Sequence, residues 1–180
     1  MIKFLNILTL LFLVCCSSAF QSKYDHLAAL TDKRITTEHN YFSIKLPQGW
    51  YKTSAKNESP YELWLNVTDY SKSMIFIKIN HNYESEESLS KIYKLVKSTK
   101  LSTDINSKLI REKEFSIGRN VFYSFEYITN DRDIRRTIVF VFNGMYFEFT
   151  AMFDGKHQLD EKEVSELFSL QNSVLSSLNN

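Results

Sequence analysis

IRRTIVFVFNGMYFEFTAM, residues 134–152, consists of two apolar runs that meet at Asn143-Gly144. An Asn-Gly step is the strongest short signal for a β-hairpin, because a type I′ turn requires positive φ at both central residues. The flanking residues are mostly β-branched or aromatic, and these types suit a pleated, half-buried surface. The stretch therefore predicts an antiparallel hairpin in the most apolar part of the chain.

Further strands are predicted on the N-terminal side of this hairpin. Residues 106–128 read as a second hairpin that turns near Gly118 to Asn120, and we expect the four strands of the two hairpins to form the centre of a sheet. Three shorter stretches alternate apolar and polar residues and predict a preceding antiparallel meander. They are Tyr41–Trp50, Tyr61–Val67 and residues 73–80.

A helix is predicted between these two groups of strands, over about thirteen residues within 85–98. Ser85 is placed to cap it, and Glu86 and Glu87 would lie in its first turn, where acidic residues are favourable. Apolar residues then recur at i, i+3, i+4 and i+7, which is the spacing of one helical face. They are Leu89, Ile92, Tyr93 and Val96.

A second helix is predicted over residues 161–178, at the C-terminal side of the long hairpins. Asp160 can cap it, Glu163 three residues later completes a capping box, and Leu159 and Val164 stand where a hydrophobic staple requires them. The order of elements predicts an α+β fold, with a central antiparallel sheet of about six to seven strands packed between helices.

The stretch FSIKLPQGW, residues 42–50, followed by a meander, a helix, long hairpins and a final helix, resembles the PsbP-like superfamily. The bacterial branch of that superfamily includes DcrB-like envelope lipoproteins. The resemblance covers roughly residues 40 to 178, and it implies an α/β/α sandwich. Because members are mostly non-catalytic accessory or binding proteins, it implies a binding role and supplies no active-site residues.

The N-terminus has the form of a cleaved export signal at residues 1–15. Lys3 precedes an apolar segment of eleven residues, which is too short to span a bilayer. Leu13 to Cys16 resembles a lipobox, which implies a membrane attachment through acyl chains such as palmitate on Cys16. The alternative is cleavage after Ala19, which would give a soluble periplasmic or secreted protein.

In the lipoprotein interpretation, residues 16–38 form a polar tether and residues 39–180 form one domain. The whole chain has 22 basic and 21 acidic residues, and removal of residues 1–15 takes away Lys3 alone among them. The mature chain is therefore neutral, which gives no reason to expect nucleic acid as a partner. Its folded part has no cysteine, which excludes thiolate catalysis and a thiolate metal site.

No pattern in the sequence predicts a metal or a cofactor. The four histidines lack the spacing of a metal site, and no phosphate-binding glycine motif occurs. They are His26, His39, His81 and His157. Asn130, Asp131 and Asp133 lack the spacing of a calcium loop, so a solvated hairpin turn is the favoured interpretation.

Two groups of residues are candidates for binding a partner. Aromatic residues cluster near the first predicted turn and could anchor a partner, although burial in the core is the favoured alternative. Three arginines lie near a predicted hairpin end and could bind an anion or a partner, although charges at such positions are more often simply solvent-exposed. The candidates are Trp50, Tyr61, Trp64, Arg132, Arg135 and Arg136.

Three functions follow from these observations. The leading hypothesis is a non-catalytic envelope lipoprotein that binds an unidentified envelope protein. The second is an envelope hydrolase that uses carboxylates on the strands, although their alternation favours a solvent-facing position; a deep polar pocket holding two of them would support it. The third is a carrier of a small hydrophobic ligand, which a cavity between sheet and helix would support. The carboxylates are Glu112, Glu114, Glu126 and Glu148.

Overall fold

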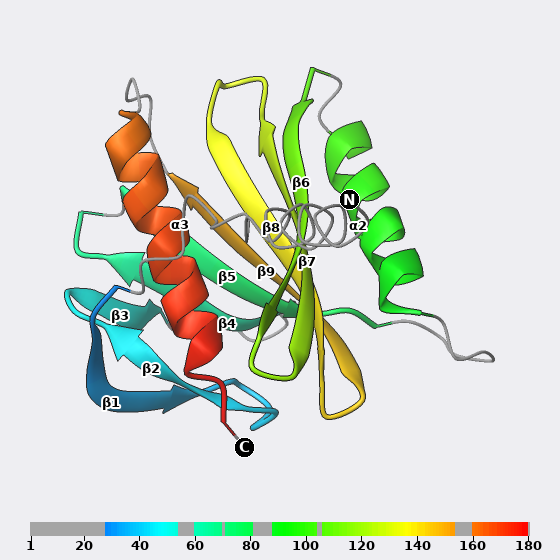
Figure 1. The fold of residues 1–180 in the computed structure, drawn as a ribbon. Helices are drawn as coiled ribbons and strands as arrows, with labels where there is room; N and C mark the ends of the chain where they lie inside the picture. The colour runs from blue at the N-terminus through cyan, green and yellow to red at the C-terminus, as the bar shows by residue number, and fades with distance from the viewer. Residues whose placement is uncertain are drawn as a thin grey trace, which may run out of the picture.

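The computed structural model describes residues 28–53, 60–69, 71–80, 88–103, 106–153 and 160–179. The largest element of the fold is a seven-stranded antiparallel sheet with strand order β3-β4-β5-β9-β8-β7-β6 (Figure 1). Its strands are β3 (Trp50–Thr53), β4 (Tyr61–Val67), β5 (Lys72–Lys78), β6 (Lys108–Ile117), β7 (Asn120–Ile128), β8 (Ile134–Phe142) and β9 (Met145–Phe153). The predicted α+β class and the predicted number of strands in the central sheet are confirmed.

The β8–β9 hairpin is the one that the Asn-Gly step predicts. Asn143 has φ 51° and Gly144 has φ 74°, the two positive values that a type I′ turn needs. Phe142 pairs directly with Met145 across this turn. The local prediction is therefore confirmed at the level of backbone angles.

The prediction that the two long hairpins form the centre of the sheet is only partly correct. β9 is the central strand, but β6 lies at one edge of the sheet. The reason is that β5 pairs with β9 along seven residues and so adds the meander β3-β4-β5 on the other side. A pairing between strands so distant in sequence cannot be read from local patterns.

A second sheet of two strands is not hydrogen-bonded to the large one. Two of the boundaries predicted from the sequence differ from those in this sheet. β1 (Leu30–Thr36) pairs with β2 (Ser43–Pro47), so residues that were predicted to belong to a tether form part of the fold. The predicted strand Tyr41–Trp50 is divided, because Gly49 at φ 78° turns the chain and Trp50 begins β3 in the large sheet. The folded domain therefore begins well before residue 39, the boundary that the sequence predicts.

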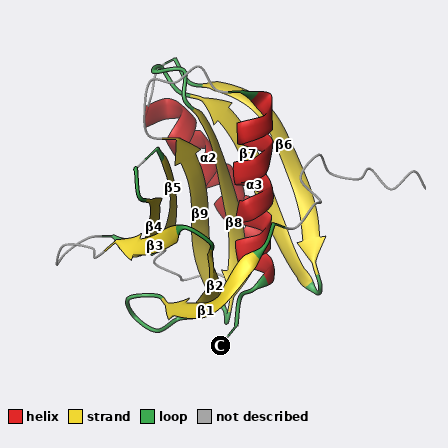
Figure 2. Ribbon diagram, turned by 90° about the vertical axis from the view of Figure 1, so that its left-hand side faces the viewer, coloured by secondary structure: helices red, strands yellow, loops and turns green. Residues whose placement is uncertain are grey.

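Two helices cover opposite faces of the large sheet (Figure 2). α3 (Glu161–Ser176) begins at Asp160, whose side chain accepts a hydrogen bond from the Lys162 backbone N–H at 3.1 Å, as predicted. α2 (Leu89–Thr103) begins later than predicted: its cap is Ser88, whose Oγ lies 3.4 Å from the Lys91 amide nitrogen. The predicted cap Ser85, the acidic pair Glu86 and Glu87, and the staple residue Leu159 lie outside the described residues.

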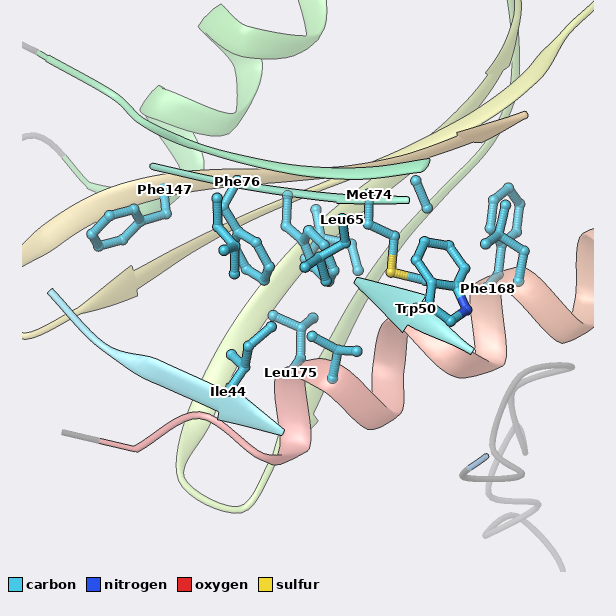
Figure 3. Close-up of a cluster of buried hydrophobic side chains, with 14 of the residues drawn as sticks. Ile44, Trp50, Leu65, Met74, Phe76, Phe147, Phe168 and Leu175 are labelled. Carbon is cyan, nitrogen blue, oxygen red and sulfur yellow. The ribbon is translucent and has the colours of Figure 1, made fainter. Parts of the chain in front are cut away.

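The main core lies between the sheet, α3 and the β1–β2 pair (Figure 3). Alternate residues of the strands point into it, and aromatic rings fill most of it; the rings of Phe76 and Phe149 are stacked with centroids 3.8 Å apart. A smaller core lies on the opposite face, under the first half of α2. Its buried residues are Ile92, Tyr93, Val96, Phe125, Tyr127 and Val139.

Candidate functional site: a cleft between helix α2 and the sheet

A cleft of about 590 Å³ lies between the C-terminal half of α2 and the sheet. Its walls come from α2, from strands β5, β7 and β9, from Arg135 on β8, and from the segments that flank β6 and β7. The lining residues are Ile77, Ile79, Leu95, Val96, Thr99, Lys100, Thr103, Ser107, Tyr127, Thr129, Asp131, Arg135 and Glu148. We call this feature the α2 cleft.

The α2 cleft exists because the side chains on the sheet-facing side of α2 change from apolar to polar along the helix. Ile92 and Val96 are buried and close the contact with the sheet in the first half. The next positions on the same face, at i+3, i+4 and i+7 from Val96, are Thr99, Lys100 and Thr103. Since these side chains are polar, they do not complete an apolar core, and the helix and the sheet stay separated there.

An ion pair joins the two walls of the cleft. Lys100 Nζ on α2 lies 2.7 Å from Glu148 Oε1 on the central strand β9. Glu148 is only 6% exposed, and Ile77 is its partner on β5. The carboxylate is therefore already engaged by a cation, and it is placed next to an aliphatic side chain.

Several polar atoms of the cleft are buried without a hydrogen-bond partner. They are Ser107 Oγ, Thr129 Oγ1 and Arg135 Nε. Both backbone groups of Thr129 are hydrogen-bonded, since its N–H donates to the Asp133 carbonyl and its carbonyl accepts from the Arg132 backbone N–H. Buried polar atoms are nearly always paired in proteins, so three unpaired ones along one cleft mark an unusual site.

A second polar contact joins α2 to β6. Tyr93 Oη donates to Glu112 Oε2 at 2.7 Å, and Lys97 Nζ lies 2.8 Å from the same carboxylate. These hydrogen bonds lower the pKa of Glu112, the one from Lys97 most. Burial, together with the bond to Glu112, raises the pKa of Tyr93 above its usual range. Glu112 therefore attaches the helix to β6 and does not face the cleft.

Two of the candidate partner-binding residues are buried: for Trp50 this agrees with the favoured core interpretation, whereas for Arg136 it corrects the expectation of a solvated charge. Trp50 is 8% exposed and packs in the core under α3 (Figure 3). Arg136 is 2% exposed, and its Nη1 donates to the Phe168 carbonyl at 3.1 Å and to Asn172 Oδ1 at 2.9 Å. Neither side chain is accessible to a partner, because α3 covers this face of the sheet.

The other four predicted residues lie in different places. Tyr61 and Trp64 form an edge-to-face pair with ring centroids 5.6 Å apart, and both are half-buried. Trp64 pairs with Ile75, on the face opposite the buried Leu63 and Leu65, as alternation predicts. Arg132 is exposed in the β7–β8 turn at φ 64°. Arg135 alone among the six lines the α2 cleft.

The four strand carboxylates do not form one pocket. Glu126 and Glu148 are each 6% exposed, so the expectation that they face solvent is wrong. They also lie on opposite faces of the sheet, because Glu126 pairs with the buried Arg136 while Glu148 faces α2. Of the four, Glu148 alone lines the cleft.

Within the described ranges, no group of three His, Cys, Asp or Glu side chains is arranged to hold a metal ion. His39 contacts the Glu62 carboxylate at 2.9 Å; His26, His81 and His157 lie outside those ranges. Residues 129–133 form the β7–β8 turn, in agreement with the favoured interpretation of Asp131 and Asp133. No helix in the described part of the chain is long and apolar enough to cross a membrane.

The sequence signal for the cleft is a change along one face of α2. Thr99, Lys100 and Thr103 continue the helical spacing of Ile92 and Val96 with polar side chains. That change marks the point where α2 stops packing on the sheet. The lining residues on the sheet lie both before and after α2 in the chain and carry no such local signal.

Comparisons with known proteins give structural similarity but no relationship in sequence. No family model matches the chain, and no curated protein matches it. The solution structure of cyanobacterial PsbP (CyanoP) from Synechocystis sp. PCC 6803 is similar, with a TM-score of 0.60 and 16% identity over 91% of this chain and 96% of that one. The Ran-binding protein Mog1p of Saccharomyces cerevisiae is similar with a TM-score of 0.53 and 10% identity, over 84% of this chain and 96% of that one.

At these identities the comparisons concern the fold alone. Both proteins match over nearly their whole length. The described residues therefore have the PsbP-like α+β fold that the stretch at residues 42–50 suggests.

Proposed function

We propose that this chain is a lipid-anchored accessory protein of a bacterial cell envelope, and that it acts by binding a protein partner rather than by catalysis. The observation that favours a binding role over a catalytic one is the α2 cleft. It offers hydrogen-bonding atoms without partners, Thr129 Oγ1 and Arg135 Nε among them, beside an aliphatic wall. Unpaired polar groups next to apolar surface are typical of a binding site.

The state of Glu148 supports binding over catalysis. A general base must accept a proton from a substrate, and a carboxylate in a short ion pair already has its charge compensated. Glu148 is in this position, with Lys100 at 2.7 Å. The hydrolase hypothesis also requires a second carboxylate beside it, and the other three candidates lie elsewhere.

The fold gives further support. Mog1p, which shares it, is a Ran-binding protein, so the same arrangement of sheet and helices serves protein binding in at least one case. We transfer only this general use to the present chain.

The attachment is proposed to be an acyl group on Cys16. The backbone N–H of Ala28 donates to Ser173 Oγ on α3 at 2.6 Å, so the chain joins the domain by residue 28. Twelve residues, 16–27, then separate the lipid from the domain. Even fully extended they reach at most about 40 Å, which would keep the domain close to the membrane surface.

The mass of the mature protein from its bacterial host tests the attachment. We expect a diacyl or triacyl mass on Cys16, together with membrane fractionation, and we expect both to be lost in Cys16→Ser. Cys15→Ser is the matched control, because it removes the neighbouring thiol and should leave the acyl mass unchanged. An unmodified chain that begins at Phe20 would refute the anchor.

The role of the carboxylates is tested separately, by complementation of a strain that lacks the protein. Glu112→Gln and Glu114→Gln should both restore the wild-type phenotype if binding is the function. Loss of complementation by a stable, correctly located Glu114→Gln variant would favour the hydrolase, since Glu114 is exposed and makes a hydrogen bond to Tyr123 that glutamine can also make.

A second candidate function is a carrier of a small ligand. The apolar part of the α2 cleft favours it, because Ile77, Ile79 and Val96 contribute aliphatic side chains to the lining.

A further inference from the structure

We propose that the α2 cleft binds a small aliphatic carboxylate. The carboxylate group is held by the three unpaired polar atoms, and the hydrocarbon chain lies along the aliphatic wall. This inference develops the carrier function proposed above and does not depend on the lipid anchor.

The polar end of the cleft is defined by Ser107, Thr129 and Arg135. Thr129 is 7% exposed, and its hydroxyl has no partner. Arg135 Nε is also buried and unpaired, while its Nη2 lies 3.9 Å from Asp133. Leaving such atoms buried without a partner costs free energy, so a ligand that pairs with them gains affinity.

A carboxylate matches these three atoms better than other groups do. Its two oxygens accept several hydrogen bonds at once, and the Nε–H of an arginine and two hydroxyls are all able to donate. A hydrogen bond between a guanidinium and a carboxylate is also strengthened by charge.

The lining residues carry two positive and two negative charges, so the net charge of the cleft does not select the ligand. Glu148 is paired with Lys100, and Arg135 Nη2 lies 3.9 Å from Asp133. Arg135 Nε has no partner, and a donor that belongs to a cation favours an anionic acceptor.

The apolar end of the cleft is defined by Ile77, Ile79 and Val96. Ile77 pairs with Glu148 on β9, whereas Arg135 pairs with Met152 on the same strand. Four residues along a strand correspond to about 13 Å. The two ends are therefore far enough apart for a medium-length chain such as that of octanoate or decanoate.

The experiment is calorimetric titration of the purified full-length protein with acetate, hexanoate, octanoate and decanoate, and with 1-octanol as the uncharged match of octanoate. Each buried methylene should tighten binding by up to about fourfold, so affinity should rise through the series. Octanol should bind at least about tenfold more weakly than octanoate, because it lacks the charge that Arg135 meets. Equal binding of octanol and octanoate would overturn the proposal.

Two variants and a control locate the site. Arg135→Gln should weaken octanoate binding by at least about tenfold, and Thr129→Val by about threefold to tenfold. Arg132→Gln removes the same charge from the same hairpin, but at an exposed position outside the cleft, and it should bind like the wild type.

Amide shifts in the NMR spectrum of the wild-type protein give a measurement that does not depend on how the variants fold. Octanoate should shift the signals of Val96, Thr129 and Arg135. Shifts confined to the opposite face, around α3, would refute the site, as would no binding by any acid at millimolar concentration. A failed anchor test with Cys16→Ser would leave these results unchanged, so the two proposals fail independently.

Discussion

Breaking the ion pair between Lys100 and Glu148 should destabilise the protein much more than breaking a surface pair. In Lys100→Met the Glu148 carboxylate, 6% exposed, loses its cation. Removing one partner of a buried pair typically costs about 3–5 kcal/mol, because the other charge is left uncompensated. The Lys100 side chain is 31% exposed, so water screens part of the interaction, and we expect about 2–3 kcal/mol.

The double variant Lys100→Met with Glu148→Leu should recover most of this loss. Both charges are then absent, and two apolar side chains of similar size adjoin Ile77 and Val96 in a partly apolar site. The matched surface control is Lys45→Met, which breaks the exposed pair with Asp32 and should cost at most about 1 kcal/mol.

Urea unfolding followed by fluorescence measures all three variants. For a chain of this length a loss of 2–3 kcal/mol also lowers the melting temperature by roughly 4–12 °C. A cost below about 1 kcal/mol for Lys100→Met would show that Glu148 is solvated in spite of its burial. A double variant no more stable than the single one would show that the side chain of Lys100 acts by packing rather than by charge.

Three further outcomes follow from the fold. Phe149→Ala removes a ring stacked on Phe76 in the core and should cost about 3–5 kcal/mol in urea unfolding, and a cost near zero would contradict the packing. Gly144→Ala places a Cβ at φ 74° and should destabilise the β8–β9 turn by about 1 kcal/mol, measured in the same way; an equally stable variant would contradict the turn type. The pKa of Glu112 is lowered in the folded state, so the ionised carboxylate should stabilise the fold fully above the unfolded-state pKa of about 4.3, and this stabilisation should be lost as pH falls through the folded-state pKa. Glu112→Gln should therefore lose less stability than the wild type between about pH 5 and 2, measured by urea unfolding at each pH. Identical pH profiles of stability for the variant and the wild type would exclude this contribution of Glu112.

Features set by neighbouring residues could be predicted from the sequence. The turn at Asn143 and Gly144 depends on two backbone angles, and the start of α3 depends on the short reach of the Asp160 side chain. Alternation likewise placed Leu63 and Leu65 on one face and Trp64 on the other. In each case the relevant partners lie within a few positions in the chain.

Features set by distant residues could not be predicted in this way. β1 has little alternation and forms because β2 and the residues after α3 lie near it, as the hydrogen bond from Arg34 Nη1 to the Ser177 carbonyl illustrates. Arg136 resembles a solvated charge in sequence, but α3 covers it and supplies hydrogen-bond acceptors. The α2 cleft likewise depends on Lys100 meeting Glu148, 48 positions away.

The central position of β9 also determines when the sheet can be completed. Phe76 on β5 pairs with Phe149, 73 positions later, so the meander β3-β4-β5 keeps an unpaired edge until residues 145–153 are available. Closing so long a loop is slow compared with forming a hairpin. We therefore expect the large sheet to be completed only after the last of its strands, β9, has been synthesised.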